Sequence, residues 1–73
     1  MKCVVEKIMN EVNRYRSDAN VTQEELALGV GVSRQTIIAL EKGNYAPSIL
    51  LALKIAGFFE VPVEKIFKIS NEK

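Results

Sequence analysis

The stretch from Thr22 to Gly43 constrains the fold of this chain more than any other part, because it carries start and stop signals for two short helices. Thr22 with Glu25 forms a capping box, in which the hydroxyl accepts an N–H of the first turn and the carboxylate reaches back to the cap N–H. Gly31 allows a tight turn, and Ser33 is a good N-cap for the second helix. Gly43 is suited to end that helix in a left-handed conformation. The stretch therefore predicts two helices joined by a tight turn.

Each of these helices has an apolar side that we expect to be buried. Apolar residues in the first helix recur at the spacing of one helical face. In the second helix, over 33–42, two apolar residues lie three positions apart. The predicted core residues of this stretch are Leu26, Ala27, Val30, Ile37 and Leu40.

The opposite face of the second helix carries a guanidinium, an amide and an ammonium group, with small or apolar residues between them. Arg34, Ile38 and Lys42 are four residues apart and form one stripe. An arginine can pair with guanine and a glutamine with adenine, and an apolar group can touch the thymine methyl. The alternative is an ordinary solvated face. The candidate base-reading residues are Arg34, Gln35, Ile38 and Ala39.

The length of 73 residues suits one domain, over 1–73, with one small core. The net charge is only +1, so nucleic-acid binding would have to come from a local face. With Cys3 as the single cysteine and no histidine, we expect a reducing compartment and neither a metal nor another cofactor. No apolar run approaches the roughly 20 residues of a membrane span, and no signal-peptide pattern is present. We therefore expect a soluble, cytoplasmic protein that does not contact a membrane.

Residues 1–19 predict a first helix, because Val5, Ile8, Val12 and Tyr15 recur at spacings of three and four. Asn20 is suited to end it, since asparagine tolerates the left-handed conformation of a C-cap.

The C-terminal third of the chain predicts two more helices. Ser48 is a plausible cap for a helix over 49–59, which is apolar almost all round and is expected to be central to the core or pressed against a partner. Pro62 favours the start of a last short helix over 63–67, and we expect 70–73 to be a frayed polar tail. The expected buried residues of 49–59 are Leu50 or Leu51, Leu53, Ile55, Ala56 and Phe59. Five helices in this order make an all-α domain.

The segments TQEELALGVGVSRQTIIALEKGNYAPS and LALKIAGFFEVPVEKIF resemble the phage repressor and Cro-like helix-turn-helix regulators, the XRE family. The resemblance covers about residues 12–67. It implies a compact five-helix bundle whose third helix enters the major groove of double-stranded DNA. It also implies a sequence-specific transcriptional regulator, a repressor, that is not an enzyme.

The resemblance implies further roles for individual residues. Gln23 matches a glutamine that touches the DNA backbone and supports the recognition helix. Arg16 and Glu41 match a structural ion pair between the first and third helices. The residues that match backbone-contacting positions, or that cap a helix where a phosphate can bind, are Thr22, Gln23, Ser33, Thr36, Lys42, Asn44 and Tyr45.

One such module reads only a few base pairs, so we expect a homodimer that places two recognition helices about 34 Å apart on an inverted repeat. The C-terminal apolar residues are the candidate dimer surface, although packing inside the monomer is the alternative and is favoured for Ile66. The candidate dimer residues are Val61, Val63, Phe67 and Ile69.

A second hypothesis is a protein-interaction module on the same fold, such as an antitoxin or a regulator-binding adaptor. It is motivated by the near-neutral charge and by the apolar outliers Leu28, Ile38 and Leu50. An enzyme is disfavoured, because the chain has no histidine, no glycine-rich phosphate loop and no metal-ligand spacing.

Gly29 lies inside a predicted helix, where glycine lowers helix stability by roughly 1 kcal/mol relative to alanine. Nothing in the sequence explains this glycine.

Overall fold

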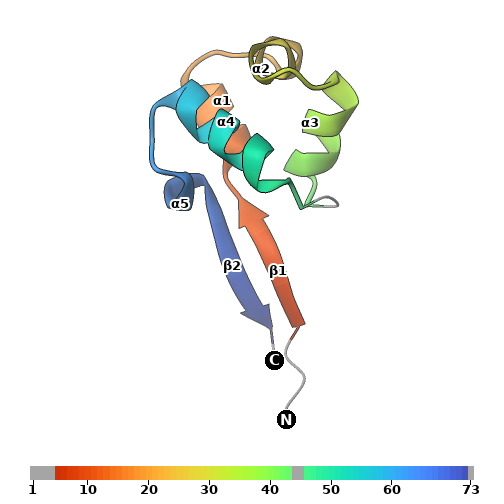
Figure 1. Cartoon of the computed structure of the whole chain (residues 1–73), viewed down its shortest axis with the longest axis vertical. Coiled ribbons are helices and arrows are strands. Elements are labelled where there is room, and N and C mark those ends of the chain that lie inside the picture. Colours follow the sequence, from red (N-terminus) through yellow and green to blue (C-terminus); the bar gives the residue numbers. More distant parts are fainter. Residues whose placement is uncertain (1–4, 44–45, 73) are drawn as a thin grey trace.

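The computed structural model describes the backbone of residues 5–43 and 46–72 as five helices and one two-stranded ribbon (Figure 1). The helices form one body, and the ribbon projects from it. The all-α bundle predicted from the sequence is confirmed, with the ribbon as an addition. The elements are β1 (Val5–Asn10), α1 (Val12–Asp18), α2 (Gln23–Val30), α3 (Arg34–Glu41), α4 (Ile49–Phe59), α5 (Val63–Ile66) and β2 (Phe67–Glu72).

The helix starts follow the predicted caps. The Thr22 hydroxyl accepts the Glu25 backbone N–H at 3.0 Å, and a Glu25 carboxylate oxygen accepts the Thr22 N–H at 2.8 Å, which completes the capping box. The Ser33 hydroxyl accepts from Thr36 N, and the Ser48 hydroxyl accepts from Leu51 N. Each cap satisfies an N–H that the helix itself leaves unpaired.

The turns also occur at the residues that the sequence predicted for them. Asn20 has φ 59°, Gly31 has φ 79° and Gly43 has φ 81°. These left-handed residues end α1, α2 and α3, and asparagine and glycine tolerate that region better than other residues. The tight turn between α2 and α3 is therefore encoded locally.

The core lies among the helices, and each of the five helices contributes at least one buried residue to it. The five core residues predicted in α2 and α3 are all buried. In α4, Leu51, Ile55 and Ala56 are buried and Phe59 is partly buried, as predicted. The prediction for Leu53 was wrong, because its side chain is 54% exposed. Among the residues whose burial the structure describes, the buried set is Val12, Leu26, Ala27, Val30, Ile37, Leu40, Leu51, Ile55, Ala56 and Ile66.

The prediction of one helix over 1–19 was wrong for its first half. Residues 5–10 form β1, which pairs antiparallel with β2 so that Ile8 lies opposite Ile69, and of the described residues 5–19 only 12–18 are helical. A short apolar segment does not distinguish strand from helix by its spacing alone. The partner strand lies at the other end of the chain, so no local pattern announces the pairing.

The same pairing corrects the C-terminal prediction. The last helix ends at Ile66, and residues 67–72, which include most of the expected frayed tail, form β2. Backbone hydrogen bonds to β1 order this segment despite its polar composition.

Gly29 has a tertiary explanation. A Cβ built on this glycine would lie 2.5 Å from Cε2 of Phe58 and 2.8 Å from its Cδ2. The Phe58 ring in turn packs edge-on against Phe59, with 5.1 Å between ring centroids. The glycine therefore lets α4 approach α2 closely, at the cost of helix propensity.

Candidate nucleic-acid interface

The helix α3 turns one side into the core and the other to solvent. Ile37 and Leu40 are fully buried, which fixes the rotation of the helix. Arg34, Gln35 and Lys42 are exposed, and the face that they share contains the predicted base-reading positions. The sequence-predicted polar face is therefore the free face of α3.

A shallow depression lies on this outer face, lined by Gln35, Ile38, Ala39 and Lys42. Ile38 and Ala39 are partly buried, so the floor is apolar, and the amide and the ammonium belong to exposed residues. Such a surface offers hydrogen-bond partners and an apolar contact side by side. It can therefore discriminate between base edges that differ in donors, acceptors and methyl groups.

Arg34 belongs to a second hollow, next to the start of α2. That hollow is lined by Arg16, Thr22, Gln23, Glu24 and Arg34. The first N–H groups of a helix and its dipole favour a negatively charged ligand. The structure thus brings Thr22, Gln23 and Arg34 together at one hollow, to which Glu24 adds a negative charge.

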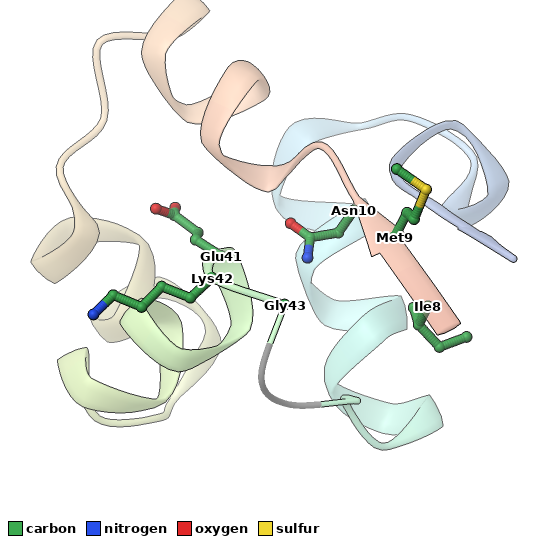
Figure 2. Close-up of a pocket in the computed structure, with 6 residues that line it drawn as sticks. All are labelled: Ile8, Met9, Asn10, Glu41, Lys42 and Gly43. Atoms are coloured by element: carbon green, nitrogen blue, oxygen red, sulfur yellow. The ribbon is translucent and has the colours of Figure 1, made fainter. Parts of the chain in front are cut away.

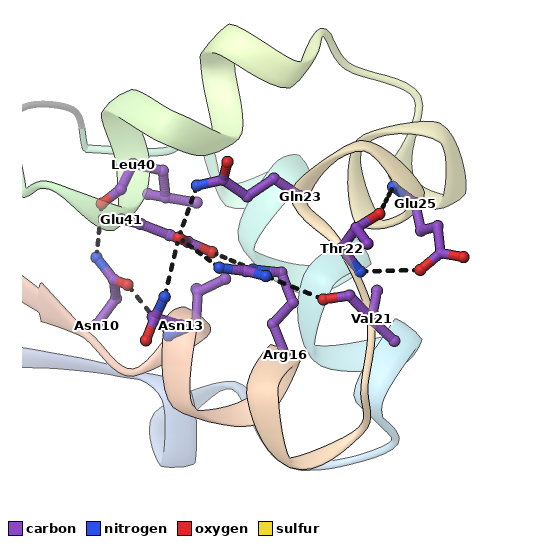
Figure 3. A network of polar contacts seen from close by, with 10 residues as sticks. Asn10, Asn13, Arg16, Val21, Thr22, Gln23, Glu25, Leu40 and Glu41 are labelled. Atoms are coloured by element: carbon purple, nitrogen blue, oxygen red, sulfur yellow. Dashed lines mark hydrogen bonds and ion pairs between the residues drawn. The ribbon is translucent and has the colours of Figure 1, made fainter.

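A polar network holds α3 against α1 and α2 (Figure 3). Nε of Arg16 donates to Oε2 of Glu41 at 2.7 Å, and Nη2 of Arg16 donates to Oε1 at 3.1 Å. The remaining arginine nitrogen Nη1 donates to the Val21 carbonyl at 3.0 Å. Both charged side chains are largely shielded from water. The ion pair that the resemblance implies is therefore present in bidentate form, which is the strong geometry for arginine and carboxylate.

Two amides complete the shell around Glu41. Nε2 of Gln23 donates to Oε1 of Glu41 at 3.1 Å, and Nδ2 of Asn13 donates to the same oxygen at 3.3 Å. Burial alone would raise the pKa of Glu41, but the hydrogen bonds from Arg16, Gln23 and Asn13 outweigh burial and lower this pKa below its ordinary value. The hydrogen bond to Glu41 likewise raises the pKa of Arg16, against the opposing effect of burial. The network is therefore ionised at neutral pH and holds the recognition helix in place.

Gln23 combines two roles in this geometry. One N–H of its amide supports Glu41 at the C-terminal end of α3. Because a side-chain amide carries two N–H groups, the other remains free for an acceptor such as a phosphate oxygen. The supporting role is thus visible in the structure, and the phosphate contact stays a prediction.

Asn10 was missed by the sequence analysis. Its Nδ2 donates to the Leu40 carbonyl at 2.8 Å and its Oδ1 accepts the Val12 N–H at 3.1 Å, so it joins the end of α3 to the start of α1. Asn13 was missed as well. The presence of asparagine inside an expected helix was the available signal, because asparagine prefers caps and turns to helix interiors.

The hydroxyls of Ser33 and Thr36 lie 3.0 Å apart and form a hydrogen bond at the exposed start of α3. Ser33 is also the cap of this helix. The predicted tip is thus pre-ordered by its own hydrogen bonds before any DNA contact, which lowers the entropy cost of binding.

A further depression lies between β1 and the end of α3, lined by Ile8, Met9, Asn10, Glu41, Lys42 and Gly43 (Figure 2). The exposed side chain of Lys42 extends away from Ile8 and Met9 in this view. Lys42 therefore lines both this depression and the depression on the outer side of α3. Asn44 and Tyr45, the other predicted phosphate contacts of this loop, lie outside the described residues.

The four predicted dimer residues are not equivalent. Val61, Val63 and Phe67 are partly buried and pack against the core, whereas Ile69 is 66% exposed. Ile66 is fully buried, as the alternative interpretation favoured.

Helix α2, the turn at Gly31 and helix α3 with its free polar face define a helix-turn-helix domain of the DNA-binding class. The helix-turn-helix family model HTH_3 matches residues 12–66. The chain belongs to this family, the XRE-type helix-turn-helix transcriptional regulators, which bind DNA.

Individual relatives agree with this assignment. The uncharacterized HTH-type transcriptional regulator MJ0272 of Methanocaldococcus jannaschii is 60% identical over 58 residues, which cover 80% of this chain and 88% of that protein. The cryptic phage CTXphi transcriptional repressor RstR of Vibrio cholerae is 33% identical over 57 residues, which cover 78% of this chain and 51% of RstR. Among solved structures, the clp gene regulator ClgR from Corynebacterium glutamicum superimposes with a TM-score of 0.70 at 28% identity, covering 74% of this chain and 57% of ClgR.

The part of the chain that the structure describes lacks both a metal-binding cluster and a membrane-spanning helix. No cluster of three or more histidine, cysteine, aspartate or glutamate side chains there could hold a metal ion. Within the same residues, no helix has the length and apolar character needed to cross a membrane.

Proposed function

We propose that this protein recognises one particular sequence of double-stranded DNA and represses transcription at that site. The observation that carries the proposal is the free face of α3, where exposed Arg34 and Gln35 accompany the apolar floor formed by Ile38 and Ala39. An α-helix fits the major groove, and these groups match the edges of base pairs. The similarity to RstR, a transcriptional repressor, supports the direction of regulation.

The base-reading roles follow from the chemistry of each side chain. Arg34 pairs with O6 and N7 of a guanine, and Gln35 pairs with N6 and N7 of an adenine. Ile38 contacts a thymine methyl group. Ala39 is too short for a hydrogen bond and contributes only an apolar contact or close approach.

The remaining site residues position the protein on the sugar-phosphate backbone. Thr22 and Gln23 stand at the start of α2, where free N–H groups and the helix dipole favour a phosphate. Lys42 adds a charge at the end of α3. The full set of proposed backbone contacts is Thr22, Gln23, Ser33, Thr36, Lys42, Asn44 and Tyr45.

The binding unit is a homodimer on an inverted repeat. A single module contacts few base pairs, so two copies related by a two-fold axis supply the remaining affinity and specificity. The two recognition helices then enter successive turns of the major groove, about 34 Å apart.

Selection from random duplex DNA at about 0.1 M salt, followed by sequencing of the retained molecules, tests this function. Enrichment of an inverted repeat with half-sites about one helical turn apart is the expected result. Enrichment of a single half-site would support base reading and contradict the homodimer. Absence of enrichment by the folded protein, also at lower salt, would overturn the proposal.

A second candidate function is a protein-interaction module. The observation that favours it is the exposure of two large apolar side chains, Leu28 at 77% and Leu50 at 64%, which a protein partner would cover. Co-purification with a stoichiometric protein partner, together with no enrichment in the DNA selection, would favour this function over DNA recognition.

A further inference from the structure

We propose that α4 forms the dimer interface, and that its exposed apolar stripe packs against the same stripe of a second copy. The stripe consists of Ile49, Leu53 and Gly57. The inference rests on the proposed function only in requiring a two-fold dimer. The experiment below measures the dimer without DNA, so the two proposals can fail separately.

The stripe is an uncovered apolar surface. Ile49 is 79% exposed and Leu53 is 54% exposed, and they lie one helical turn apart, with Gly57 a turn further. Lys54 is the only charged residue in α4. The opposite side of the same helix is already in the core, so α4 is apolar on both sides. A helix with this pattern is typically buried on both sides in its functional state.

The shape of the stripe suits a copy of itself. When two α4 helices pack antiparallel about an axis at Leu53, Ile49 lies opposite Gly57 of the partner subunit, since each is four residues from the axis. A Cβ built on Gly57 meets no atom within 4 Å, so the space above this glycine is open. The most exposed side chain of the stripe, Ile49, thus faces its smallest residue, Gly57, on both sides of the axis.

The charges are complementary in the same arrangement. Glu60 is exposed and follows the last residue of α4. Antiparallel packing brings its carboxylate toward the N-terminal end of the partner's α4, where the helix dipole favours an anion. Lys54 falls beside the stripe rather than on it, so the two lysines do not face each other at the axis.

The stripe lies within a wider surface. A standard interface removes about 800 Å² from each partner, so an α4 dimer also needs apolar residues beside Ile49, Leu53 and Gly57. Leu50 extends the apolar surface along the flank of the stripe. The C-terminal set predicted from the sequence offers less, because Val61, Val63 and Phe67 are partly buried and only Ile69 is strongly exposed.

Engineered disulfides test this interface directly. Cys3, the only cysteine, is replaced by serine, and one new cysteine is introduced by Leu53→Cys. Helix axes roughly 8–10 Å apart leave two Cα atoms at the axis close to the 4.4–6.8 Å range of disulfides. Matched controls are Ile69→Cys, on the competing C-terminal surface, and Leu28→Cys, on the exposed side of α2. The readout is the fraction of chains at twice the monomer mass after mild oxidation.

We expect most Leu53→Cys chains to cross-link, and only a small fraction of the chains in either control. Preferential cross-linking of Ile69→Cys would overturn the α4 interface in favour of the C-terminal surface. Equal cross-linking of all three variants would indicate random collision and would also overturn it.

Sedimentation of the unmodified protein and of a charge variant gives a second, independent measurement. Leu53→Lys places like charges together at the axis, so we expect the two-chain species to become single chains, while Leu28→Lys remains a dimer. Unchanged dimerisation of folded Leu53→Lys, or a wild-type protein that is monomeric at about 0.1 mM, contradicts the inference. Loss of inverted-repeat binding by Leu53→Lys with retained half-site binding would support both proposals.

Discussion

Arg16 and Glu41 are joined by two parallel hydrogen bonds, 2.7 Å and 3.1 Å long, although they are 25 positions apart in the sequence. This pair connects α1 to the C-terminal end of α3, the helix whose free face is the candidate DNA-reading surface. The orientation of that surface therefore depends on a side-chain contact outside it.

Arg16→Ala is expected to destabilise the fold, because it leaves the shielded Glu41 carboxylate without its charge partner. Breaking a fully buried pair costs about 3–5 kcal/mol, so we expect about 2–3 kcal/mol for this partly shielded one. Urea unfolding of the free protein measures the loss. Arg14→Ala, which removes an exposed pair with Glu11, is the control and should cost less than about 1 kcal/mol. Equal losses in the two variants would contradict a special role for Arg16.

The pH dependence of stability provides a separate test of Glu41. Hydrogen bonding lowers its pKa in the folded protein, so the folded state binds fewer protons at this carboxylate than the unfolded state does. This contribution to stability is present above the unfolded pKa of about 4.3 and is lost as the pH falls through the folded pKa. The free energies of unfolding of Glu41→Gln and of the wild type should therefore converge as the pH falls below about 5. Parallel unfolding free energies from pH 7 to pH 3 would argue against the ionised network.

Arg34→Ala is expected to weaken binding to the selected DNA by about 1–3 kcal/mol and to relax the preference at one base pair. The guanidinium can pair with two acceptors of guanine, and alanine offers no replacement. Competition binding with single-base variants of the site measures both effects. An unchanged base preference at every position of the site would contradict a base-reading role for Arg34.

Lys42→Ala is expected to weaken all DNA sequences alike. A lysine that neutralises one phosphate releases one counterion equivalent, so the slope of log K against log salt should decrease in magnitude by about 0.9. Binding titrations across a salt series measure this slope. A slope equal to that of wild type, with normal folding, would show that Lys42 does not contact phosphate.

Gly29→Ala is expected to fail to stabilise α2, although alanine is favoured over glycine inside helices by about 1 kcal/mol. The new methyl group would meet the Phe58 ring at 2.5 Å and force it from its contact with Phe59. Thermal unfolding should show a lower midpoint for Gly29→Ala. In a Phe58→Ala background the same substitution should raise the midpoint, and a rise in both backgrounds would contradict the packing role.

Local signals predicted the starts of α2, α3 and α4 correctly, whereas α1 begins at Val12, inside the helix predicted over 1–19. These signals act between residues three or four positions apart, so a short stretch of sequence contains both partners of each contact. They are the capping box at Thr22, the caps at Ser33 and Ser48, and the left-handed Gly31. The free polar face of α3 followed from the same periodicity, since burial of Ile37 and Leu40 leaves only one orientation for Arg34 and Gln35. The ion pair between Arg16 and Glu41 came from family resemblance, because no local pattern relates these residues.

The sequence by itself determined where α2, α3 and α4 begin and which side of the recognition helix is free, because caps, turns and apolar periodicity act between near neighbours. The tertiary structure alone decided that residues 5–10 form a strand, because their partner is at 67–72 and the pairing depends on the intervening bundle. It also decided that Gly29 accommodates Phe58 and that Asn10 holds the end of α3. In each of these the deciding contact joins distant residues, and its geometry exists only after the helices have packed.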